Sequence, residues 1–420
     1  MFETISMIGL GYIGLPTATL FASRKKKVIG VDISQHAVDT INQGKIHIVE
    51  PELDMLVHSA VTEGYLRATT QPEPADAFLI AVPTPFTDGH KPDLSYIEAA
   101  AKSIAPVLAK GNLVILESTS PVGATEKLAD WLAAARPDLT FPQQAGEEAD
   151  IQIAYCPERV LPGTVVHELV ANDRVIGGMT NKATEMASAL YKTFVEGALV
   201  PTNARTAEMC KLTENSFRDV NIAFANELSM ICDKLGIDVW ELIALANRHP
   251  RVNILQPGCG VGGHCIAVDP WFIVDTTPNE ARLIRTAREV NDHKPKWVLE
   301  KVKAAIADVL AKKAGSTMAD IKVACLGLAF KPDIDDLRES PAVEIAQHIA
   351  QLGCQVLAVE PNIEVLPGKL KTVILSLNSL NDALMVADVV CVLVKHKPFI
   401  DSVLDIRNHG MVIDAVGLFT

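Results

Sequence analysis

The sequence predicts an α/β protein in which two doubly wound domains are joined by a central helical domain. Near both ends of the chain, short apolar strand candidates alternate with helical patterns, which is typical of parallel sheets covered by helices. Between them, residues 205–247 contain one glycine and no proline, and their apolar residues recur at helical spacing. We therefore expect one long helix there, with Gly236 as its candidate break.

The length and composition fit this architecture. At roughly 150 residues per domain, 420 residues give two or three domains. We place them at residues 1–203, 204–310 and 320–420, with a linker at 311–320. Apolar residues make up 49% and charged residues 21%, as in an ordinary globular chain.

Charge, cysteine usage and hydropathy exclude several classes of protein. Lys and Arg total 38 against 51 Asp and Glu, a net charge of −13, so we expect no nucleic-acid partner and no anionic membrane surface. The start of the chain lacks a signal-peptide pattern, and no apolar run approaches the roughly 18 residues that span a bilayer. The eight cysteines are scattered without zinc spacing, so we expect a reduced, cytoplasmic protein with no metal site.

The expected elements follow in chain order. In the first domain, a helix at Leu15–Ser23 follows the first of five strands: Ile5–Ile8, Lys27–Val31, Ala77–Val82, Leu113–Glu117 and Ile151–Tyr155. In the middle, a glycine-rich loop at 258–263 precedes helices over 279–310. The last domain has a helix at Pro341–Leu352 and strands at Lys322–Leu328, Val356–Val359 and Val389–Val394.

A dinucleotide fingerprint follows the first strand. Gly9 permits a tight turn, Gly11 lets the backbone approach a pyrophosphate, and Gly14 allows close packing of helix on strand. The helix N-terminus then offers N–H groups to the phosphates. Asp32 ends the second strand, 18 residues past Gly14, where a carboxylate accepts hydrogen bonds from ribose hydroxyls and repels a 2′-phosphate. The pattern predicts a Rossmann-like domain that binds NAD rather than NADP.

Three threonines lie where ligands of such sheets bind. Thr84 and Thr119 follow apolar strands, and Thr125 follows the second of these turns closely. Ligands of open α/β sheets bind outside the carboxyl ends of the strands. We expect ligand contacts from these threonines, and only chain turning from the neighbouring prolines.

Cys265 is the candidate nucleophile. Four glycines of the segment from Gly258 to Gly263 precede it, so backbone N–H groups can approach an anion or a developing oxyanion. A small buried cysteine is the alternative reading, and it suits Cys325 and Cys391 better, because they lie inside strands. Asp269, four residues after Cys265, is a candidate general base or orienting group.

The long helix carries a second group of candidates. Spacings of four and three residues place Lys211, Asn215 and Arg218 on one helical face, an arrangement that suits an oxyanion or a phosphate. An exposed polar face is the alternative, with Lys211 paired to Glu208 or Glu214. A further basic cluster, with His249 and Arg251, precedes the glycine-rich loop.

A dinucleotide site together with a reactive thiol permits two successive oxidations. Hydride loss turns a primary alcohol into an aldehyde, and a cysteine can add to the aldehyde to form a thiohemiacetal. A second hydride loss gives a thioester, which water cleaves to a carboxylate.

Six motifs in order along the chain resemble the UDP-glucose/GDP-mannose dehydrogenase family. They are the fingerprint Gly9–Gly14, the turn Ser118–Pro121, Cys156–Arg159, Glu208-x-x-Lys211-x-x-x-Asn215, Gly260-x-Gly262-Gly263-His264-Cys265-Ile266-x-x-Asp269, and Phe330-Lys331-Pro332-x-x-x-Asp336-x-Arg338-x-Ser340-Pro341. The resemblance implies that residues 1–203 bind NAD, that 204–310 carry catalytic groups and form a homodimer through the long helix, and that 320–420 bind a UDP-sugar.

The resemblance also implies residue roles. Cys265 is the nucleophile, Lys211 and Asn215 stabilise the oxyanion, Lys211 helps to deprotonate the C6 hydroxyl, and Glu158, Thr119 and Asp269 share the handling of water. The NAD contacts are Gly9, Gly11, Tyr12, Ile13, Gly14, Asp32, Thr84, Thr125 and Arg338, the last being similar to a residue that reaches an active site across a dimer. The sugar-nucleotide contacts are Arg159, Val160, Lys211, Asn215, Arg218, His249, Arg251, Gly262, Phe330 and Lys331.

The expected substrate within the family is UDP-N-acetyl-D-mannosamine. The segments 155–163 and 246–253 are similar to members that act on this sugar, and Pro162 stands where UDP-glucose dehydrogenases usually carry a second glutamate. The alternatives are the same chemistry on UDP-N-acetylglucosamine or UDP-glucose, a two-electron hydroxyacid dehydrogenase, and a nucleotide-sensing module without turnover.

Overall fold

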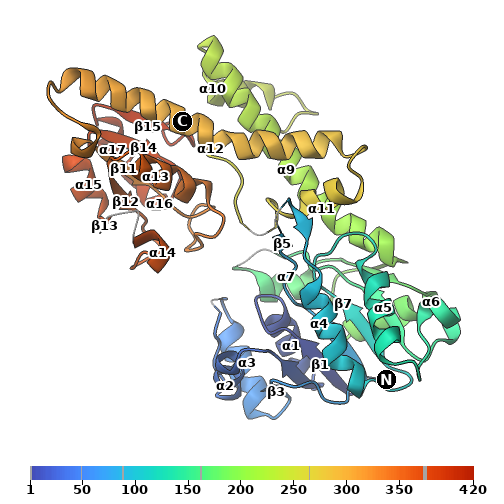
Figure 1. Cartoon of the computed structure of the whole chain (residues 1–420). Coiled ribbons are helices and arrows are strands. Elements are labelled where there is room, and N and C mark those ends of the chain that lie inside the picture. The colour runs from blue at the N-terminus through green and yellow to red at the C-terminus, as the bar shows by residue number, and fades with distance from the viewer. Residues whose placement is uncertain (1, 49, 88, 161–162, 264, 372–375) are drawn as a thin grey trace. The chain divides into compact units, whose positions relative to one another are not determined.

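The computed structural model describes all residues except 1, 49, 88, 161–162, 264 and 372–375 (Figure 1). Pro162 and His264, which entered the sequence analysis, therefore lie outside the described residues. The chain divides into two compact units, Met1–Glu214 and Asn215–Thr420. The helix α9, Ala204–Leu235, begins in the first unit and continues into the second.

The first unit is built on an eight-stranded sheet, counted over the described residues, with the order β10-β9-β8-β7-β4-β1-β2-β3. Its strands are β1 Thr4–Ile8, β2 Lys27–Val31, β3 Leu66–Thr69, β4 Ala77–Ile80, β7 Leu113–Leu116, β8 Gln152–Tyr155, β9 Arg174–Gly178 and β10 Leu199–Asn203, and β5 Phe86–Thr87 pairs with β6 Lys91–Pro92. Its helices are α1 Gly14–Ser23, α2 Gln35–Asn42, α3 Leu53–Thr62, α4 Ser95–Ile104, α5 Ala124–Ala135, α6 Pro142–Ala145, α7 Val165–Ala171 and α8 Asn181–Tyr191.

Helices cover both faces of this sheet, as the sequence predicts. On one face, Phe21 of α1 and Tyr191 of α8 pack in a core with Met7 of β1. On the other, Ile97 of α4 and Leu128 of α5 pack in a second core, with β4 and β7. The sheet pairs are parallel except that β8 and β9 run antiparallel, a detail that the strand patterns alone do not give.

The second unit contains a five-stranded parallel sheet, again counted over the described residues, with the order β13-β12-β11-β14-β15. Its strands are β11 Lys322–Leu326, β12 Gln355–Val359, β13 Ser376–Leu377, β14 Val389–Val392 and β15 Val412–Asp414. Its helices are α10 Val239–Ala246, α11 Asp269–Thr276, α12 Arg282–Lys312, α13 Pro341–Gln351, α14 Gly368–Lys371, α15 Leu380–Val386, α16 Lys397–Asp401 and α17 Val403–Arg407.

The long helices confirm the helical middle of the chain. Helix α9 has 32 residues and ends just before Gly236, whose φ of 68° lies in the left-handed region that stops a helix. Helix α12 has 31 residues and packs its apolar side, including Val302 and Ile306, onto the sheet of the second unit. Two doubly wound sheets and a long central helix are therefore the observed fold.

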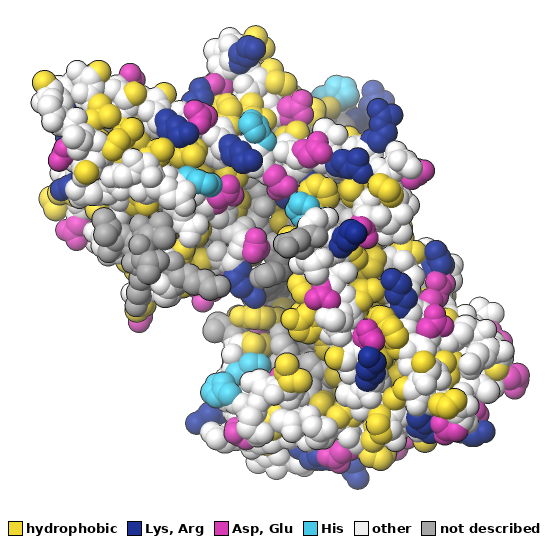
Figure 2. Space-filling model, viewed as in Figure 1, with side chains coloured by type: hydrophobic (Ala, Val, Ile, Leu, Met, Phe, Trp, Pro, Cys, Tyr) yellow, Lys and Arg dark blue, Asp and Glu magenta, His cyan; other side chains and the backbone are white. Residues whose placement is uncertain are grey.

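The described surface mixes charges of both signs. On the face shown in Figure 2, lysine and arginine side chains are interspersed with aspartate and glutamate. Within the described residues, no helix is both long enough and apolar enough to cross a membrane.

Candidate active site

The glycine turn after β1 has the geometry that a pyrophosphate requires. Gly9 adopts a φ of 91°, and a Cβ there would lie 2.4 Å from the carbonyl oxygen of Ala81. A Cβ on Gly14 would lie 1.8 Å from the carbonyl oxygen of Gly9, so the third glycine is fixed by the contact of helix and turn. At Gly11 a Cβ would meet no atom within 4 Å, so this position is open to a ligand.

The helix that follows offers few first-turn donors besides the N–H of Gly14. Ile13, the residue before α1, supplies no side-chain cap, but the Leu15 N–H already donates to the Gly11 carbonyl oxygen at 3.1 Å, and Pro16 has no N–H. Tyr12 is 43% exposed beside this turn. The glycine turn, with Gly11 open to a ligand, therefore fits the phosphates of a dinucleotide.

Asp32 is fixed at the end of β2 by backbone donors. Its Oδ2 accepts a hydrogen bond from the Leu10 N–H at 2.9 Å, and its Oδ1 accepts one from the Ser34 N–H at 2.9 Å. The carboxylate is thus tied to the glycine turn itself and is half-buried. It is placed to receive the ribose hydroxyls of a nucleotide bound at that turn.

The three threonines have different environments. The Oγ1 of Thr84 is buried and has no hydrogen-bond partner among the described residues. A bound ligand could supply the missing hydrogen bond. Thr119 is half-buried in the turn after β7, and this turn is tied to the end of β4 because the Ser118 hydroxyl donates to the Val82 carbonyl at 2.7 Å. Thr125 is fully buried, and its hydroxyl donates to Glu208 at 2.6 Å.

Glu208 has a structural role that the sequence did not indicate, where it was considered only as an alternative partner of Lys211. One carboxylate oxygen accepts from the Gly123 N–H at 2.7 Å, and the other accepts from the N–H and the hydroxyl of Thr125 at 2.8 and 2.6 Å. Glu208 lies on α9 and caps the start of α5, so it fixes the beginning of α9 against the first sheet. Burial raises the pKa of this carboxyl. Its place in the motif with Lys211 was the available signal.

Lys211 is buried on α9, at 9% exposure. The two glutamates three residues before and after it, Glu208 and Glu214, have other partners. Glu208 caps α5, and Glu214 forms an ion pair with Arg159 at 2.7 Å. The alternative of an exposed Lys–Glu face therefore does not describe Lys211. Arg218, seven residues further, is exposed.

Glu158 and Arg159 follow β8, at the same edge of the sheet as Thr84 and Thr119. Glu158 is buried, with one oxygen accepting from the Arg159 N–H at 2.8 Å and the other from Arg174 at 3.0 Å. Val160 packs against the core of the first sheet. Arg174 was not identified as a functional candidate from the sequence. The available signal was a single charged residue at the first position of an apolar strand.

In the second unit, Cys265 lies one turn before α11 and is exposed. Its carbonyl oxygen accepts from the N–H groups of Val268 and Asp269, at 3.1 and 2.9 Å, which fixes the backbone beside the thiol. Asp269 is buried, and its Oδ2 accepts from the Asn215 amide at 2.5 Å. Three predicted residues, Asn215, Cys265 and Asp269, are thus brought together.

The glycine-rich loop before Cys265 is held along its length. The Gly258 N–H donates to Asn226 of α9 at 2.9 Å, and the Cys259 thiol donates to the Leu393 carbonyl at 3.2 Å. A Cβ on Gly262 would lie 2.4 Å from the Glu339 carbonyl oxygen, and one on Gly263 would lie 3.0 Å from the Phe330 ring. Glycine is required here because the loop packs directly on the segment 330–339.

The remaining predicted contacts lie on exposed segments of the second unit. Lys331 is exposed after the half-buried Phe330, and exposed Arg338 forms an ion pair with Asp336 at 2.7 Å. His249 and Arg251 are exposed after α10.

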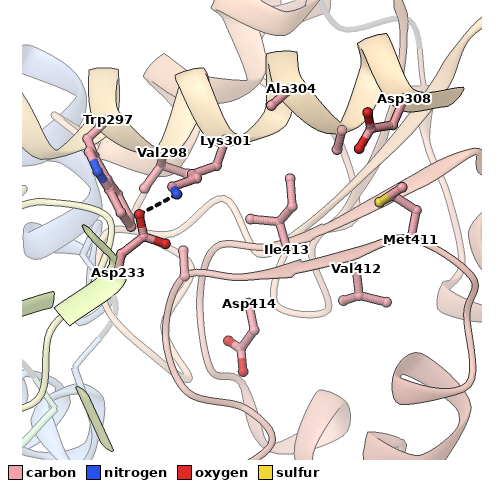
Figure 3. Close-up of a pocket in the computed structure, with 12 residues that line it drawn as sticks. Asp233, Trp297, Val298, Lys301, Ala304, Asp308, Met411, Val412, Ile413 and Asp414 are labelled. Atoms are coloured by element: carbon pink, nitrogen blue, oxygen red, sulfur yellow. Dashed lines mark hydrogen bonds and ion pairs between the residues drawn. The ribbon is translucent and has the colours of Figure 1, made fainter. Parts of the chain in front are cut away.

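The second unit contains a cleft of about 360 Å³ (Figure 3). It runs between α12 and β15, and Figure 3 shows Asp233 and Lys301 joined by an ion pair across from Ile413 and Asp414. None of its lining residues is a predicted site residue.

Comparison with known proteins identifies the family. Three models of the UDP-glucose/GDP-mannose dehydrogenase family match the chain: the NAD binding domain over residues 3–195, the central domain over 205–293 and the UDP binding domain over 324–420. The chain belongs to the UDP-glucose/GDP-mannose dehydrogenase family. It is an NAD-dependent dehydrogenase, and the cradle at Gly9–Gly14, Asp32 and Thr84 fits that cofactor.

Full-length relatives agree with this assignment. The chain is 67% identical over 419 residues to the UDP-N-acetyl-D-mannosamine dehydrogenase of Escherichia coli (strain K12), covering 100% of this chain and 99% of the relative. It is 66% identical over 421 residues to the NDP-N-acetyl-D-galactosaminuronic acid dehydrogenase of Ralstonia nicotianae, covering 100% and 97%. The solved structure of the UDP-D-ManNAc dehydrogenase from Pyrococcus horikoshii matches with a TM-score of 0.87 at 38% identity, covering 99% of this chain and 96% of the other.

Proposed function

We propose that the protein catalyses the four-electron oxidation of the C6 hydroxyl of UDP-N-acetyl-D-mannosamine to UDP-N-acetyl-D-mannosaminuronate, in the cytoplasm, as a step toward a surface polysaccharide. The observation that carries the proposal is the local arrangement at Cys265. An exposed thiol lies on a fixed backbone, and Asp269 is hydrogen-bonded at 2.5 Å to Asn215 on the helix that also carries Lys211. Such a set supports covalent catalysis on a carbonyl.

The proposed reaction begins with two residues of α9. Lys211 takes the proton of the C6 hydroxyl as C6 gives up a hydride, and bound NAD would supply the hydride acceptor for both oxidations. The thiol of Cys265 loses its proton to solvent, and its sulfur then bonds to the carbon of the C6 aldehyde and forms the anion of a thiohemiacetal. Lys211 and Asn215 stabilise the oxygen anion of this adduct, as charged and amide donors do in other acyl-transfer sites.

The second oxidation leaves a thioester on Cys265, and water must cleave it. The water oxygen bonds to the thioester carbon, the carbon–sulfur bond breaks, and the sulfur of Cys265 leaves with the electron pair. The proton lost by the water goes to Glu158, while Thr119 and Asp269 orient the attacking water. The products are a uronate and the free enzyme.

The proposed binding roles follow the family resemblance and the three segments. Residues 1–203 hold NAD through the glycine turn, Tyr12, Ile13, Asp32, Thr84 and Thr125, with Arg338 added from the last domain, 320–420. In the structure, Thr125 is already engaged by Glu208, so we expect its contribution to pass through the turn it stabilises. The proposed sugar-nucleotide contacts are Arg159, Val160, Arg218, His249, Arg251, Gly262, Phe330 and Lys331, with the central segment, 204–310, supplying Lys211 and Asn215.

A homodimer through α9 is part of the proposal. Phe217, Phe224 and Ile231 recur every seven residues on this helix and are 69%, 53% and 44% exposed. A stripe of large apolar side chains at this spacing is typical of a helix that packs on a partner helix.

The sugar is tested with a panel of nucleotide sugars. The relatives at 67% and 66% identity carry the names of two different N-acetylated sugars, so identity alone does not select one. We expect UDP-N-acetyl-D-mannosamine to give the highest kcat/KM, with uronate as the product by mass spectrometry, and UDP-N-acetylglucosamine and UDP-glucose to be poorer. A higher kcat/KM for either of these would overturn the proposed substrate, and reduction of NAD without uronate would overturn the four-electron reaction.

A further inference from the structure

A buried cluster in the first unit surrounds the proposed base Glu158. The Arg174 guanidinium donates to Glu158 at 3.0 Å and to the sulfur of Cys156 at 3.7 Å, and it lies 4.0 Å from Glu117. The hydroxyl of Tyr191 donates to Glu117 at 2.5 Å. These side chains come from the start of β9, the segment after β8, the residue after β7 and the last residue of α8.

The cluster is almost completely buried. Its described members include two carboxyl groups, Glu117 and Glu158, and one guanidinium, that of Arg174. The side chains of Arg174 and Glu117 are 4% and 0% exposed, whereas that of Glu158 is 10% exposed. Two buried carboxylates at one cation carry an uncompensated negative charge, which is costly in a low-dielectric interior. One carboxyl group is therefore expected to hold a proton.

The hydrogen bonds indicate which one. Glu158 accepts from the guanidinium of Arg174 and from the Arg159 N–H, so both of its oxygens have donors, as a carboxylate needs. Glu117 has one donor, Tyr191, and its Oε2 has no partner among the described residues. Burial is the main cause that raises the pKa of Glu117 to about 7, against the lowering effect of Arg174. The proton belongs on Glu117.

We propose that Arg174 is a positioning residue that keeps Glu158 ionised and oriented for thioester hydrolysis. Glu117 carries a proton and is neutral, so it does not compete with Glu158 for the positive charge of the Arg174 guanidinium. The proposal rests on the proposed function, because it gives Glu158 the proton of the attacking water. Arg174 and Glu117 are too deeply buried for a substrate to contact them directly. Only Glu158, the most exposed of the three, opens toward the surface at the carboxyl edge of the sheet.

The charge assignment is tested without substrate, by infrared spectroscopy of the resting protein below pH 7. We expect wild type to show a protonated-carboxyl band that is absent from Glu117→Gln. If the two spectra carry the same protonated-carboxyl bands, the proton is not on Glu117 and the proposal is wrong. This readout does not depend on the identity of the sugar, so it separates failure of the inference from failure of the proposed function.

The positioning role is tested with Arg174→Lys, which keeps the charge but loses the planar fork that reaches Glu158 and Cys156 together. Because a positioned general base contributes roughly 10²–10⁴ in rate, we expect steady-state turnover to fall by at least about tenfold. The first-turnover burst of NADH should persist, and an acyl adduct should accumulate on Cys265 by mass spectrometry, because only the hydrolysis step is slowed.

The matched control is Arg136→Lys, which alters another arginine of the first unit, paired with Asp138 on the surface. We expect it to retain the burst and the turnover of wild type. A folded Arg174→Lys protein with wild-type turnover and no adduct would refute the positioning role. Loss of burst and turnover together, in either unfolded or folded protein, would also contradict it, since that result means a purely structural role.

Discussion

At the scale of single residues, Cys265 differs from the other cysteines in its exposure. All eight lie in the described part of the chain, and Cys265 is exposed whereas Cys210 is half-buried and the others are buried. Burial raises the pKa of the thiols of Cys156, Cys259 and Cys325 to about 12, so these groups stay protonated and unreactive near neutral pH.

We predict that Cys265→Ala abolishes uronate formation while the protein still binds NAD, because the thioester route needs this sulfur. An alkylating reagent should modify Cys265 before any other cysteine, as peptide mass spectrometry would show. The matched control is Cys354→Ala, a buried thiol of the last domain, which should retain turnover. Uronate formation at the wild-type rate by Cys265→Ala would contradict the covalent mechanism.

A second prediction at this scale concerns stability and pH. Because burial raises the pKa of Glu117 from 4.5 to about 7, the folded protein keeps a proton that the unfolded chain loses. The contribution of Glu117 to the free energy of unfolding should therefore fall as pH rises from about 4.5 to about 7 and stay level above. Glu117→Gln should flatten this part of the curve of Tm against pH. An identical curve for variant and wild type would show that the group titrates normally.

At the scale of elements, the start of α9 depends on one carboxylate. Glu208 receives three donors from the turn and first residues of α5. We predict that Glu208→Ala lowers the free energy of unfolding by roughly 1–3 kcal/mol, because it leaves buried donors without an acceptor. Glu208→Gln keeps one acceptor and should lose less. Chemical denaturation measures both, and equal stability of all three proteins would disprove the capping role.

The exposed stripe of α9 gives a prediction about assembly. Phe224→Glu places a charge in the proposed helix–helix contact and should convert the dimer to a monomer, whereas Phe224→Leu keeps an apolar side chain and should leave it dimeric. Light scattering after size exclusion gives the mass of each. A wild-type monomer, or a Phe224→Glu dimer, would refute the proposed interface.

Helices and strands with local sequence patterns could be predicted, whereas features that depend on tertiary contacts could not. Strands with continuous apolar runs, such as Lys27–Val31, and the break of the long helix at Gly236 could be predicted because their patterns are local. Strand β9 could not, because it ends in Gly177 and Gly178, and glycine is depleted in strands. The engagement of Thr125 by Glu208 is a tertiary contact over 83 residues, invisible to spacing rules.

At the scale of the whole molecule, the chain repeats one construction in two sheets. In the first, Asp32 after β2 accepts from the N–H of Leu10 after β1. In the second, Glu360 after β12 accepts from the N–H of Leu328 after β11, at 2.7 Å, but there buried His396 lies 3.0 Å from the same carboxylate. The carboxylate of Asp32 is half-buried, whereas that of Glu360 is fully buried. This difference agrees with the different ligands of the two family domains, which are an NAD binding domain and a UDP binding domain.

If one active site oxidises each sugar twice, the number of NADH formed per sugar shows it. With limiting UDP-N-acetyl-D-mannosamine and excess NAD, we expect two NADH for each sugar consumed and one uronate released. One NADH per sugar, with an aldehyde as the product, would contradict it.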